Sequence, residues 1–237
     1  MMTNSAIQQK TLIQMKEVGV NYRNSLNIWS RKDIWALKQV TFEVRAGETL
    51  GIIGKNGAGK STLLKLLAGI IEPDVGLITR NVRSVMLLSL QVGFLPQLSG
   101  RENAILSGIL LGMRKLQVTN SMEEIIEFSG LQEYIDYPVR TYSSGMKARL
   151  GFAVACQADP DVLLVDEVLG VGDASFNEKS KKLMVDKINS DKTVVIVSHN
   201  ESTIEQYCDR VVLIDKGESI LEGSPAEVFA AYKNVGV

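Results

Sequence analysis

The sequence has few of the residues that build disulfide scaffolds, metal cages or irregular chains. Of its 237 residues, 2 are cysteines, 5 are prolines and 1 is a histidine. Cys156 and Cys208 fit no metal-ligand spacing, and no early apolar stretch resembles a signal peptide, so we expect two buried thiols and a cytoplasmic location. The composition excludes disordered, collagen-like and disulfide-rich chains, and 45% hydrophobic residues are enough for a sizeable core.

The sequence also lacks an excess of charge and a long hydrophobic run. It carries 26 Lys and Arg against 27 Asp and Glu, a net charge of −1, so the overall charge does not attract nucleic acid or anionic lipid. The richest apolar stretches, 63–71 and 105–113, fall well short of the roughly 20 residues that a transmembrane helix needs. We therefore expect no nucleic-acid partner and no membrane-spanning segment.

Short apolar runs alternate with stretches of helical periodicity. Runs that predict strands lie at 41–44, 49–53, 162–165 and 193–197, and the last two are continuous, as in strands buried on both faces. Apolar residues at helical spacing predict helices at 61–68, 175–188 and 201–207. This alternation is typical of a parallel α/β sheet.

Two segments depart from that alternation. From residue 101 to 149 Met, Leu, Glu and Lys dominate and strand-like runs disappear, which predicts a mainly helical insertion. Apolar arms on either side of Lys216-Gly217 predict a hairpin over 210–222. Ser224, Pro225 and Glu227 have the order N-cap, N1 and N3, so a short capped helix should follow.

A glycine-rich segment carries the most specific chemical signal. Gly54-Lys55-Asn56-Gly57-Ala58-Gly59-Lys60-Ser61 matches the phosphate-binding pattern G-x-x-x-x-G-K-[ST] between a predicted strand and a predicted helix. The glycines let backbone N–H groups turn toward phosphate oxygens, and Thr62 follows in the first helical turn. Lys60 supplies a cation for the β- and γ-phosphates, and the Ser61 hydroxyl is a ligand for Mg²⁺. We expect this phosphate loop to bind ATP with Mg²⁺.

Two acids and the single histidine follow further predicted strands. Asp166 and Glu167 end the run that begins at 162, and His199 comes two residues after the run that ends at Val197. The carboxyl ends of parallel strands face the ligand crevice, so Asp166 can reach Mg²⁺ and Glu167 can polarise an attacking water. His199 can hydrogen-bond the γ-phosphate or that water. We expect Lys60, Glu167 and His199 to be the catalytic residues.

A third group, Tyr142-Ser143-Ser144-Gly145, opens a helix predicted at 146–158. Small hydroxyl residues and glycine at a helix N-terminus form either an anion site or only a helix cap. One γ-phosphate does not need two such sites. In the functional interpretation, Ser143, Ser144 and Gly145 therefore bind the nucleotide of a neighbouring chain.

The order of these motifs resembles the ATP-binding cassette (ABC) ATPases over about residues 14–222. The family signature is usually Leu-Ser-Gly-Gly-Gln. Ser143 and Gly145 match it, whereas Tyr142, Ser144 and Met146 depart from it. Four segments resemble the branch whose members energise export of O-antigen, capsule or teichoic-acid polymers: 35–38, 100–103, 141–146 and 166–173. Ordinary importers usually have Glu-Pro-Thr where this chain has residues 167–169, which argues against an importer.

The resemblance assigns roles to further residues. Asp173 stands at the position that links two nucleotide sites across a dimer. Tyr22 stands where an aromatic residue stacks on adenine, with Trp35 as the alternative. Gln91 is the expected Q-loop glutamine and a further Mg²⁺ ligand, with Gln97 as the alternative.

The resemblance also implies a fold. It is an α/β P-loop NTPase fold with a RecA-like mixed-sheet core, an N-terminal β subdomain and an inserted helical subdomain. A single nucleotide-binding domain would span 1–237, with the core at about 1–90 and 152–222, the helical subdomain at about 91–151 and a short C-terminal helix at 224–237. Only residues 223–237 follow the predicted hairpin, so we expect no polymer-binding module of the kind that some members of the branch carry.

The partners implied are a second copy of the chain and a membrane protein. A head-to-tail homodimer would hold two Mg·ATP between the phosphate loop of one chain and residues 143–145 of the other, at the cytoplasmic face of the inner membrane. A separate integral membrane subunit, in two copies, would dock near 91–102 and carry a polysaccharide linked to a lipid. The alternatives are an exporter ATPase for a lipid or a drug, a soluble cassette ATPase acting on ribosomes or DNA, and a nucleotide-binding scaffold without turnover.

Overall fold

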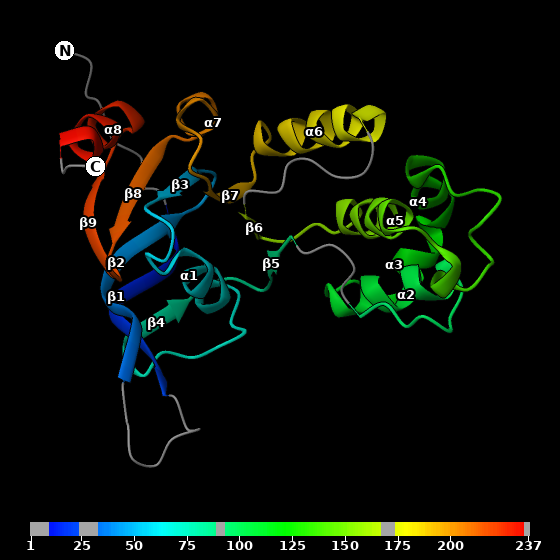
Figure 1. The fold of residues 1–237 in the computed structure, drawn as a ribbon, viewed down its shortest axis with the longest axis horizontal. Helices are drawn as coiled ribbons and strands as arrows, with labels where there is room; N and C mark the ends of the chain where they lie inside the picture. The colour runs from blue at the N-terminus through cyan, green and yellow to red at the C-terminus, as the bar shows by residue number, and fades with distance from the viewer. Residues whose placement is uncertain (1–9, 24–32, 89–92, 167–173, 235–237) are drawn as a thin grey trace. The chain divides into compact units, whose positions relative to one another are not determined.

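The computed structural model describes residues 10–23, 33–88, 93–166 and 174–234. Within these residues the chain divides into two compact units. The α/β unit holds 10–23, 33–87, 161–166 and 188–234, and the helical unit holds 88, 93–160 and 174–187. Figure 1 labels the helices and strands of both units.

The α/β unit is built on a nine-stranded sheet with the order β4-β1-β2-β9-β8-β3-β7-β6-β5. The strands are β1 (Thr11–Arg23), β2 (Asp33–Arg45), β3 (Thr49–Ile53), β4 (Val75–Arg80), β5 (Val85–Leu87), β6 (Val162–Asp166), β7 (Thr193–Val197), β8 (Arg210–Asp215) and β9 (Glu218–Gly223). Strands β8, β3, β7, β6 and β5 pair in parallel, whereas β1 pairs antiparallel with both β2 and β4. This mixed sheet confirms the predicted fold class.

Helices cover both faces of the central strands. The helices of this unit are α1 (Lys60–Leu67), α7 (Glu201–Tyr207) and α8 (Pro225–Asn234). Successive residues of a strand point to opposite faces. Leu50 and Ile52 of β3 share one core cluster with the leucines of α1, whereas a Cβ on Gly51 would lie 3.3 Å from Ile204 of α7. The two helices therefore lie on opposite faces of β3, as Figure 1 shows.

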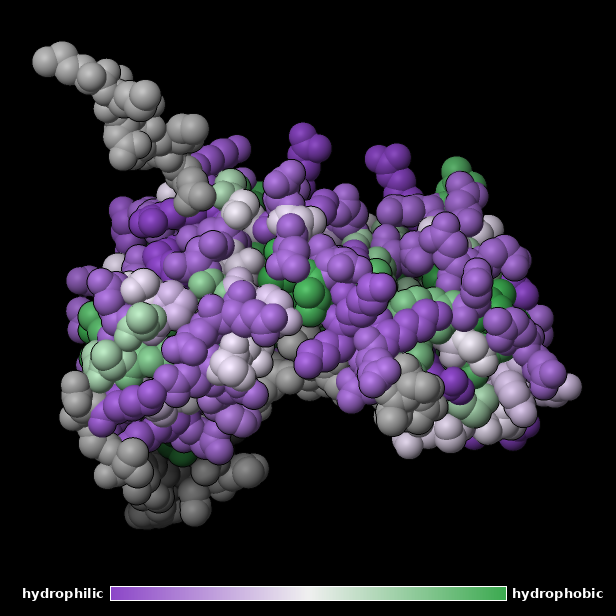
Figure 2. All heavy atoms as spheres, turned by 90° about the horizontal axis from the view of Figure 1, so that it is seen from above, coloured by the Kyte–Doolittle hydropathy of each residue, from purple (hydrophilic) through white to green (hydrophobic). Residues whose placement is uncertain are grey.

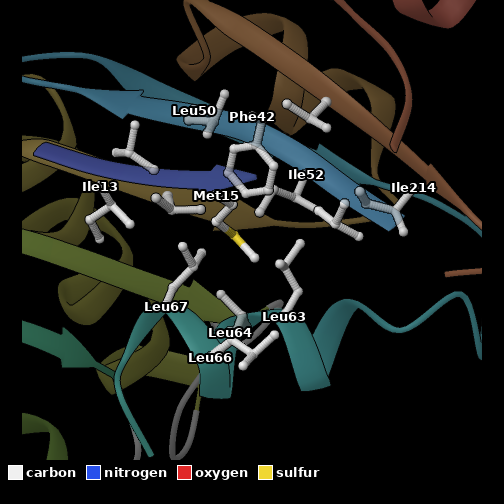
Figure 3. Close-up of a cluster of buried hydrophobic side chains, with 14 of the residues drawn as sticks. Ile13, Met15, Phe42, Leu50, Ile52, Leu63, Leu64, Leu66, Leu67 and Ile214 are labelled. Atoms are coloured by element: carbon white, nitrogen blue, oxygen red, sulfur yellow. The ribbon is translucent and has the colours of Figure 1, made fainter. Parts of the chain in front are cut away.

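One hydrophobic core joins α1 to both parts of the sheet. Four leucines of α1 are each at most 1% exposed: Leu63, Leu64, Leu66 and Leu67. They belong to one core cluster with strand residues that include Ile13, Met15, Phe42, Leu50, Ile52 and Ile214, and Figure 3 shows this cluster. Burying one leucine side chain contributes about 1.5–3 kcal/mol. This burial fixes α1, and with it the loop 54–59 that leads into the helix.

The hairpin and the capped helix that the sequence predicts are present. Lys216 and Gly217 between β8 and β9 have φ angles of 48° and 83°, the left-handed values that a two-residue hairpin turn needs. At the start of α8 the Ser224 N–H donates to the Glu227 carboxylate at 2.9 Å, and the Glu227 N–H donates to the Ser224 hydroxyl at 3.4 Å. This is a reciprocal capping box.

Three strands were not predicted from the sequence. β1 carries polar residues, and its register shifts near Glu17 in the pairing with β2 and in the pairing with β4, which breaks the alternation that identifies a strand. β4 is largely exposed, and β5 is only three residues long. Propensity and periodicity are weak in such segments, and pairing with neighbouring strands defines them instead.

The helical unit contains the segment that the sequence predicts to be helical. Its elements are α2 (Gly100–Leu110), α3 (Lys115–Asn120), α4 (Met122–Ser129), η1 (Val139–Thr141), α5 (Ser144–Cys156) and α6 (Ala174–Ile188). Phe128, Phe152 and Phe176 bring α4, α5 and α6 together, with ring centroids 5.4 to 6.0 Å apart. These three aromatic residues form the centre at which the helices pack.

The surface and the two thiols can be described residue by residue. Figure 2 shows one face of the molecule, on which hydrophilic side chains predominate. Among the described residues, no helix combines the length and the apolar character needed to cross a membrane. Cys208 is buried and Cys156 partly buried, and desolvation raises the pKa of each thiol to about 12.

Candidate nucleotide site

The phosphate loop connects β3 directly to α1. Gly57 and Gly59 have φ angles of 80° and 104°, a backbone conformation that side chains with a Cβ rarely adopt. Gly59 is the N-cap of α1 and provides no side-chain cap. The first-turn N–H groups, including those of Ser61 and Thr62, have no acceptor within the helix. They are therefore available to an anion.

Lys60 lies where the motif predicts a phosphate-binding cation. Its ammonium Nζ donates hydrogen bonds to the carbonyls of Gly54 at 2.7 Å and Lys55 at 3.0 Å. The loop thus curls around the charged end of its own lysine. Asn56, Gly57 and Ser61 are exposed around this ammonium, so a phosphate group can approach it.

Backbone groups of other strands hold the phosphate loop in place. The Gly217 N–H at the tip of the β8–β9 hairpin donates to the carbonyl of Ala58 at 3.2 Å. A Cβ on Gly59 would lie 2.5 Å from the carbonyl oxygen of Ala36 in β2, and a Cβ on Gly54 would collide with the carbonyl of Ile214. Glycine is therefore needed at 54 and 59 for close packing as well as for phosphate access.

Sheet register brings Asp166 and His199 to the edge where the phosphate loop begins. Val197 of β7 pairs with Ile52 of β3 on one side and with Asp166 of β6 on the other. The phosphate loop starts two residues after Ile52, and His199 lies two residues after Val197. These groups are all in the α/β unit and gather at the carboxyl ends of parallel strands, where ligands bind in such sheets.

The oxygen ligands at this edge fit a magnesium ion. Ser61 provides an exposed hydroxyl, and Asp166 provides a carboxylate at the end of β6. Mg²⁺ prefers hard oxygen ligands and commonly takes one or two protein groups together with substrate phosphates. The donor set therefore suits Mg²⁺ bound with a nucleotide.

The structure separates the two candidate adenine-stacking residues. Tyr22 is 46% exposed, and its hydroxyl lies 3.5 Å from the hydroxyl of Thr62 on α1. Trp35 pairs with Asn21 and so lies on the same face of the strand pair as Asn21. Tyr22 is the next residue along the strand and therefore lies on the opposite face from Trp35. Its ring packs 3.1 Å from where a Cβ on Gly19 would be. Tyr22 thus lies on the face that carries the phosphate-loop helix.

Three predicted site residues, Glu167, Asp173 and Gln91, lie outside the described residues. Their roles stay predictions from the sequence. Gln97, the alternative to Gln91, is exposed in a turn of the helical unit that precedes α2.

The second predicted anion site opens α5 in the helical unit. The Ser143 hydroxyl is the N-cap and accepts from the Met146 N–H at 3.1 Å. Ser143 and Ser144 are exposed, and a Cβ on Gly145 would be no closer than 3.8 Å to another group. The preceding Tyr142 is buried, and desolvation together with the charge of Asp136 raises the pKa of its hydroxyl to about 12, so it stays a donor.

The fold and the phosphate loop together define a P-loop nucleotide-binding protein. Residues 37–170 match the family described as ABC transporter. The chain belongs to the ABC transporter family, as its motif order indicates.

Relatives within this family are named for polymer export. The chain is 50% identical over 200 residues to the O-antigen export system ATP-binding protein RfbB of Myxococcus xanthus, which covers 84% of this chain and 46% of that protein. It is 43% identical over 219 residues to the protein of the same name from Klebsiella pneumoniae, covering 92% and 89%. It is 42% identical over 216 residues to the teichoic acids export ATP-binding protein TagH of Lactococcus lactis, covering 91% and 45%. The chain thus spans slightly less than half of the first and third relatives.

Solved structures support the same fold. The dimeric structure of a bacterial ABC transporter cassette superimposes with a TM-score of 0.70 at 23% identity, covering 90% of this chain and 99% of that one. The structure of an ATP-binding subunit of an ABC transporter gives a TM-score of 0.73 at 21% identity, covering 96% and 95%. The cassette fold is therefore the fold of this chain.

Sequence reasoning missed the backbone groups that hold the phosphate loop. The sequence predicts a hairpin at Lys216-Gly217, but nothing in it shows that the tip contacts Ala58. The same is true of the carbonyls of Ala36 and Ile214. Such contacts depend on strand order in the sheet, and only the unusual density of glycine in the loop indicates close packing.

Proposed function

We propose that this chain is the ATP-hydrolysing subunit of an exporter of a cell-surface polysaccharide such as O-antigen. One observation carries the proposal: the phosphate loop, Asp166 and His199 meet at one edge of the parallel strands. Two of the relatives described above are named for O-antigen export and one for teichoic acids export, and these names support the class of cargo.

The site residues divide the work of phosphoryl transfer among them. Lys60 and the N–H groups of the phosphate loop, from Gly54 to Thr62, hold the phosphates of ATP. Ser61 and Asp166, with help from Gln91, would hold Mg²⁺, which would supply positive charge to the phosphates of ATP. Glu167 orients the attacking water, and His199 hydrogen-bonds the γ-phosphate. Catalysis then comes from positioning and charge stabilisation rather than from covalent chemistry.

The adenine ring stacks on Tyr22 in this proposal. The position of Tyr22 beside Thr62 supports it over Trp35, which lies on the other face of the strand pair.

Two chains cooperate in a head-to-tail homodimer. Ser143, Ser144 and Gly145 of one chain bind the γ-phosphate held by the other, and Asp173 links the two sites. The proposal is supported by a second helix N-terminus with exposed hydroxyl groups and by the dimeric cassette with the same fold. Each chain is one nucleotide-binding domain, in which the α/β unit is the core and the helical unit contains the inserted subdomain.

An integral membrane subunit, in two copies, carries a polysaccharide linked to a lipid across the inner membrane, and this chain binds it on the cytoplasmic face. The segment near 91–102 of the helical unit is the docking surface. Leu95 and Leu110 are 48% and 56% exposed, and a Cβ on Gly93 would collide with Leu110, so apolar side chains lie exposed beside this segment. Exposed apolar groups of this kind support a protein partner.

A Glu167→Gln variant tests the activity. The amide keeps the shape of the side chain but cannot accept the proton of the attacking water, so ATP should bind and hydrolysis should stop. Dimers should then accumulate in Mg·ATP and elute early in size-exclusion chromatography. Glu178→Gln, an exposed carboxylate on α6, is the matched control and should hydrolyse ATP normally. Normal turnover by a monomeric Glu167→Gln variant would overturn the assignment.

The cargo is tested on the native membrane complex. Purification of the chain from membranes, followed by mass spectrometry of bound glycolipid, should identify a lipid-linked polysaccharide and an integral membrane subunit. Recovery with ribosomes, with DNA, or with a membrane subunit loaded with a drug or a simple lipid contradicts the proposed cargo.

A further inference from the structure

Tyr142 lies at the point where two segments of the helical unit meet. It is 5% exposed and directly precedes Ser143, the N-cap of α5. Its hydroxyl donates a hydrogen bond to the carbonyl of Tyr134 at 2.6 Å. A Cβ on Gly100, the first residue of α2, would collide with the same hydroxyl. The tyrosine ring therefore reaches from the start of α5 to the start of α2.

The start of α2 is bound to the segment 134–138 by further hydrogen bonds. The Gly100 N–H donates to the carbonyl of Tyr137 at 3.2 Å, and the Arg101 N–H donates to that of Ile135 at 2.9 Å. The Arg101 side chain also forms an ion pair with Asp136 at 2.8 Å. These contacts hold the first turn of α2 against the segment 134–138.

The segment that precedes α2 belongs to the same block. Asn103 is fully buried, and its amide bonds the backbone of 95–99: its oxygen accepts from the Leu95 N–H at 2.7 Å, and its nitrogen donates to the carbonyls of Leu95, Leu98 and Ser99. The Val139 N–H donates to the carbonyl of Leu98 and the Arg140 N–H to that of Pro96, each at 2.9 Å. A satisfied buried amide of this kind fixes one arrangement of its loop.

We propose that Tyr142 is a positioning residue that fixes Ser143, Ser144 and Gly145 relative to the N-terminus of α2. A leucine at this position would have no hydroxyl to bond the Tyr134 carbonyl and could not make this connection. A displacement of 95–103 is then carried through Gly100 and Tyr142 to the start of α5. The inference rests on the proposed function, in which residues 143–145 bind the nucleotide of the second chain and 91–102 contacts the membrane subunit.

The first test removes the hydroxyl alone. In Tyr142→Phe, hydrogen exchange should speed up in peptides covering both 99–103 and 143–147, because the link between them is lost. The expected change is about fivefold, the effect of one hydrogen bond of typical strength. Tyr134→Phe is the matched control, since it deletes an exposed hydroxyl nearby and keeps the carbonyl that Tyr142 bonds. Faster exchange in only one of the two peptides, or in neither, overturns the proposal.

The second measurement separates positioning from a purely structural role. In a Glu167→Gln background, Tyr142→Phe should weaken ATP-driven dimerisation about fivefold, while ATP binding to the single chain stays unchanged. A structural role alone would lower the unfolding midpoint and leave the dimerisation of the folded protein unaffected, and that result overturns the proposal. If the Glu167→Gln chain itself does not dimerise with ATP, the proposed function fails, and the exchange experiment still decides the role of Tyr142.

The contact with Gly100 has its own test. Gly100→Ala should lower the unfolding midpoint strongly in the wild-type chain and much less in a Tyr142→Leu background, because the colliding hydroxyl is gone. The same Cβ would lie 2.9 Å from the carbonyl of Ile135 in both backgrounds. This contact therefore does not affect the difference in unfolding midpoint between them. Gly108→Ala, on the same helix against Val118, should cost the same in both backgrounds. Equal effects of Gly100→Ala in the two backgrounds overturn the contact.

Discussion

The N–H of Gly217 donates a hydrogen bond to the carbonyl of Ala58 at 3.2 Å, so the tip of the β8–β9 hairpin touches the phosphate loop. The carbonyl of Gly217 in turn accepts from the Lys38 N–H of β2 at 2.8 Å. One residue thereby links the phosphate loop, the hairpin and the antiparallel strands. The shape of the loop depends on this residue as well as on the glycines of the motif.

Replacement of Gly217 should therefore weaken nucleotide binding. A Cβ there would lie 2.9 Å from the carbonyl of Ala36 and 3.0 Å from the Cα of Leu37, so Gly217→Ala must displace backbone. We expect ATP affinity to fall about tenfold, a loss of 1.4 kcal/mol, measured by calorimetry.

Gly47→Ala is the control for backbone strain. Gly47 has a similar φ angle of 72°, but a Cβ there meets nothing within 4 Å. Both variants should lose about 1 kcal/mol of stability from the strained conformation. If the two variants bind ATP with equal affinity, the hairpin does not shape the phosphate loop.

The central strands and their helices were predictable because burial leaves a clear pattern. β3 and β7 are buried at every position, so each reads as a continuous apolar run. β4 has the opposite character, since Val75 and Leu77 are 44% and 61% exposed and only pairing with β1 makes the segment a strand. Local sequence does not encode that pairing.

For the site, motif spacing located the groups but not their contacts. The phosphate loop, Asp166 and His199 each follow a predicted strand, and parallel register brings them to one edge. The choice between Tyr22 and Trp35 depends on a register shift between Val20 and Asn21, which no periodicity reveals. The contact of Gly217 with Ala58 joins residues far apart in the chain and depends on strand order.

Lys60→Ala should reduce ATP affinity with little effect on folding. The variant removes the cation that the loop carbonyls hold, and a charge-assisted hydrogen bond contributes about 1.5–3 kcal/mol, so affinity should fall at least tenfold. Lys65→Ala removes an equal charge from an exposed position on α1 and is the matched control. Wild-type affinity for ATP in the Lys60→Ala variant would contradict the role of this lysine.

A buried ion pair joins the strands away from the site. Arg210 donates to both carboxylate oxygens of Glu48, at 2.6 and 3.1 Å, and Glu48 is only 4% exposed. Arg210→Ala leaves this carboxylate buried without its cation, so the free energy of unfolding should fall by about 3–5 kcal/mol in urea denaturation. Lys233→Ala breaks the exposed pair with Glu201 and should give no measurable change. If the free energy of unfolding falls by a similar amount in the two variants, the buried pair contributes no more to stability than the exposed one.

Glu43 should contribute to the loss of stability in acid. Its hydrogen bonds from Arg45 and Thr11 hold its pKa below the ordinary value of 4.5. A lowered pKa in the folded state adds stability above the ordinary value, and this stability is lost as the pH falls through the folded pKa. Glu43→Gln should therefore lose less stability than the wild type between neutral pH and a pH below 4.5.

The measurement is denaturant unfolding at several pH values. Glu205→Gln, an exposed carboxylate on α7, is the control and should follow the wild-type pH profile. If Glu43→Gln loses as much stability in acid as the wild type, this carboxylate does not contribute to the loss.

In the proposed dimer the phosphate loop of one chain and residues 143–145 of another form one catalytic site. Mixing a Ser143→Arg chain with a Lys60→Ala chain and measuring ATP hydrolysis tests this shared site. Each homodimer has two damaged sites, whereas the mixed dimer has one intact site, made by the phosphate loop of the Ser143→Arg chain and the signature of the Lys60→Ala chain. A site shared between the chains should give the mixture an activity above the average of the two parents. Activity that stays at that average, under conditions where mixed dimers are shown to form, contradicts it.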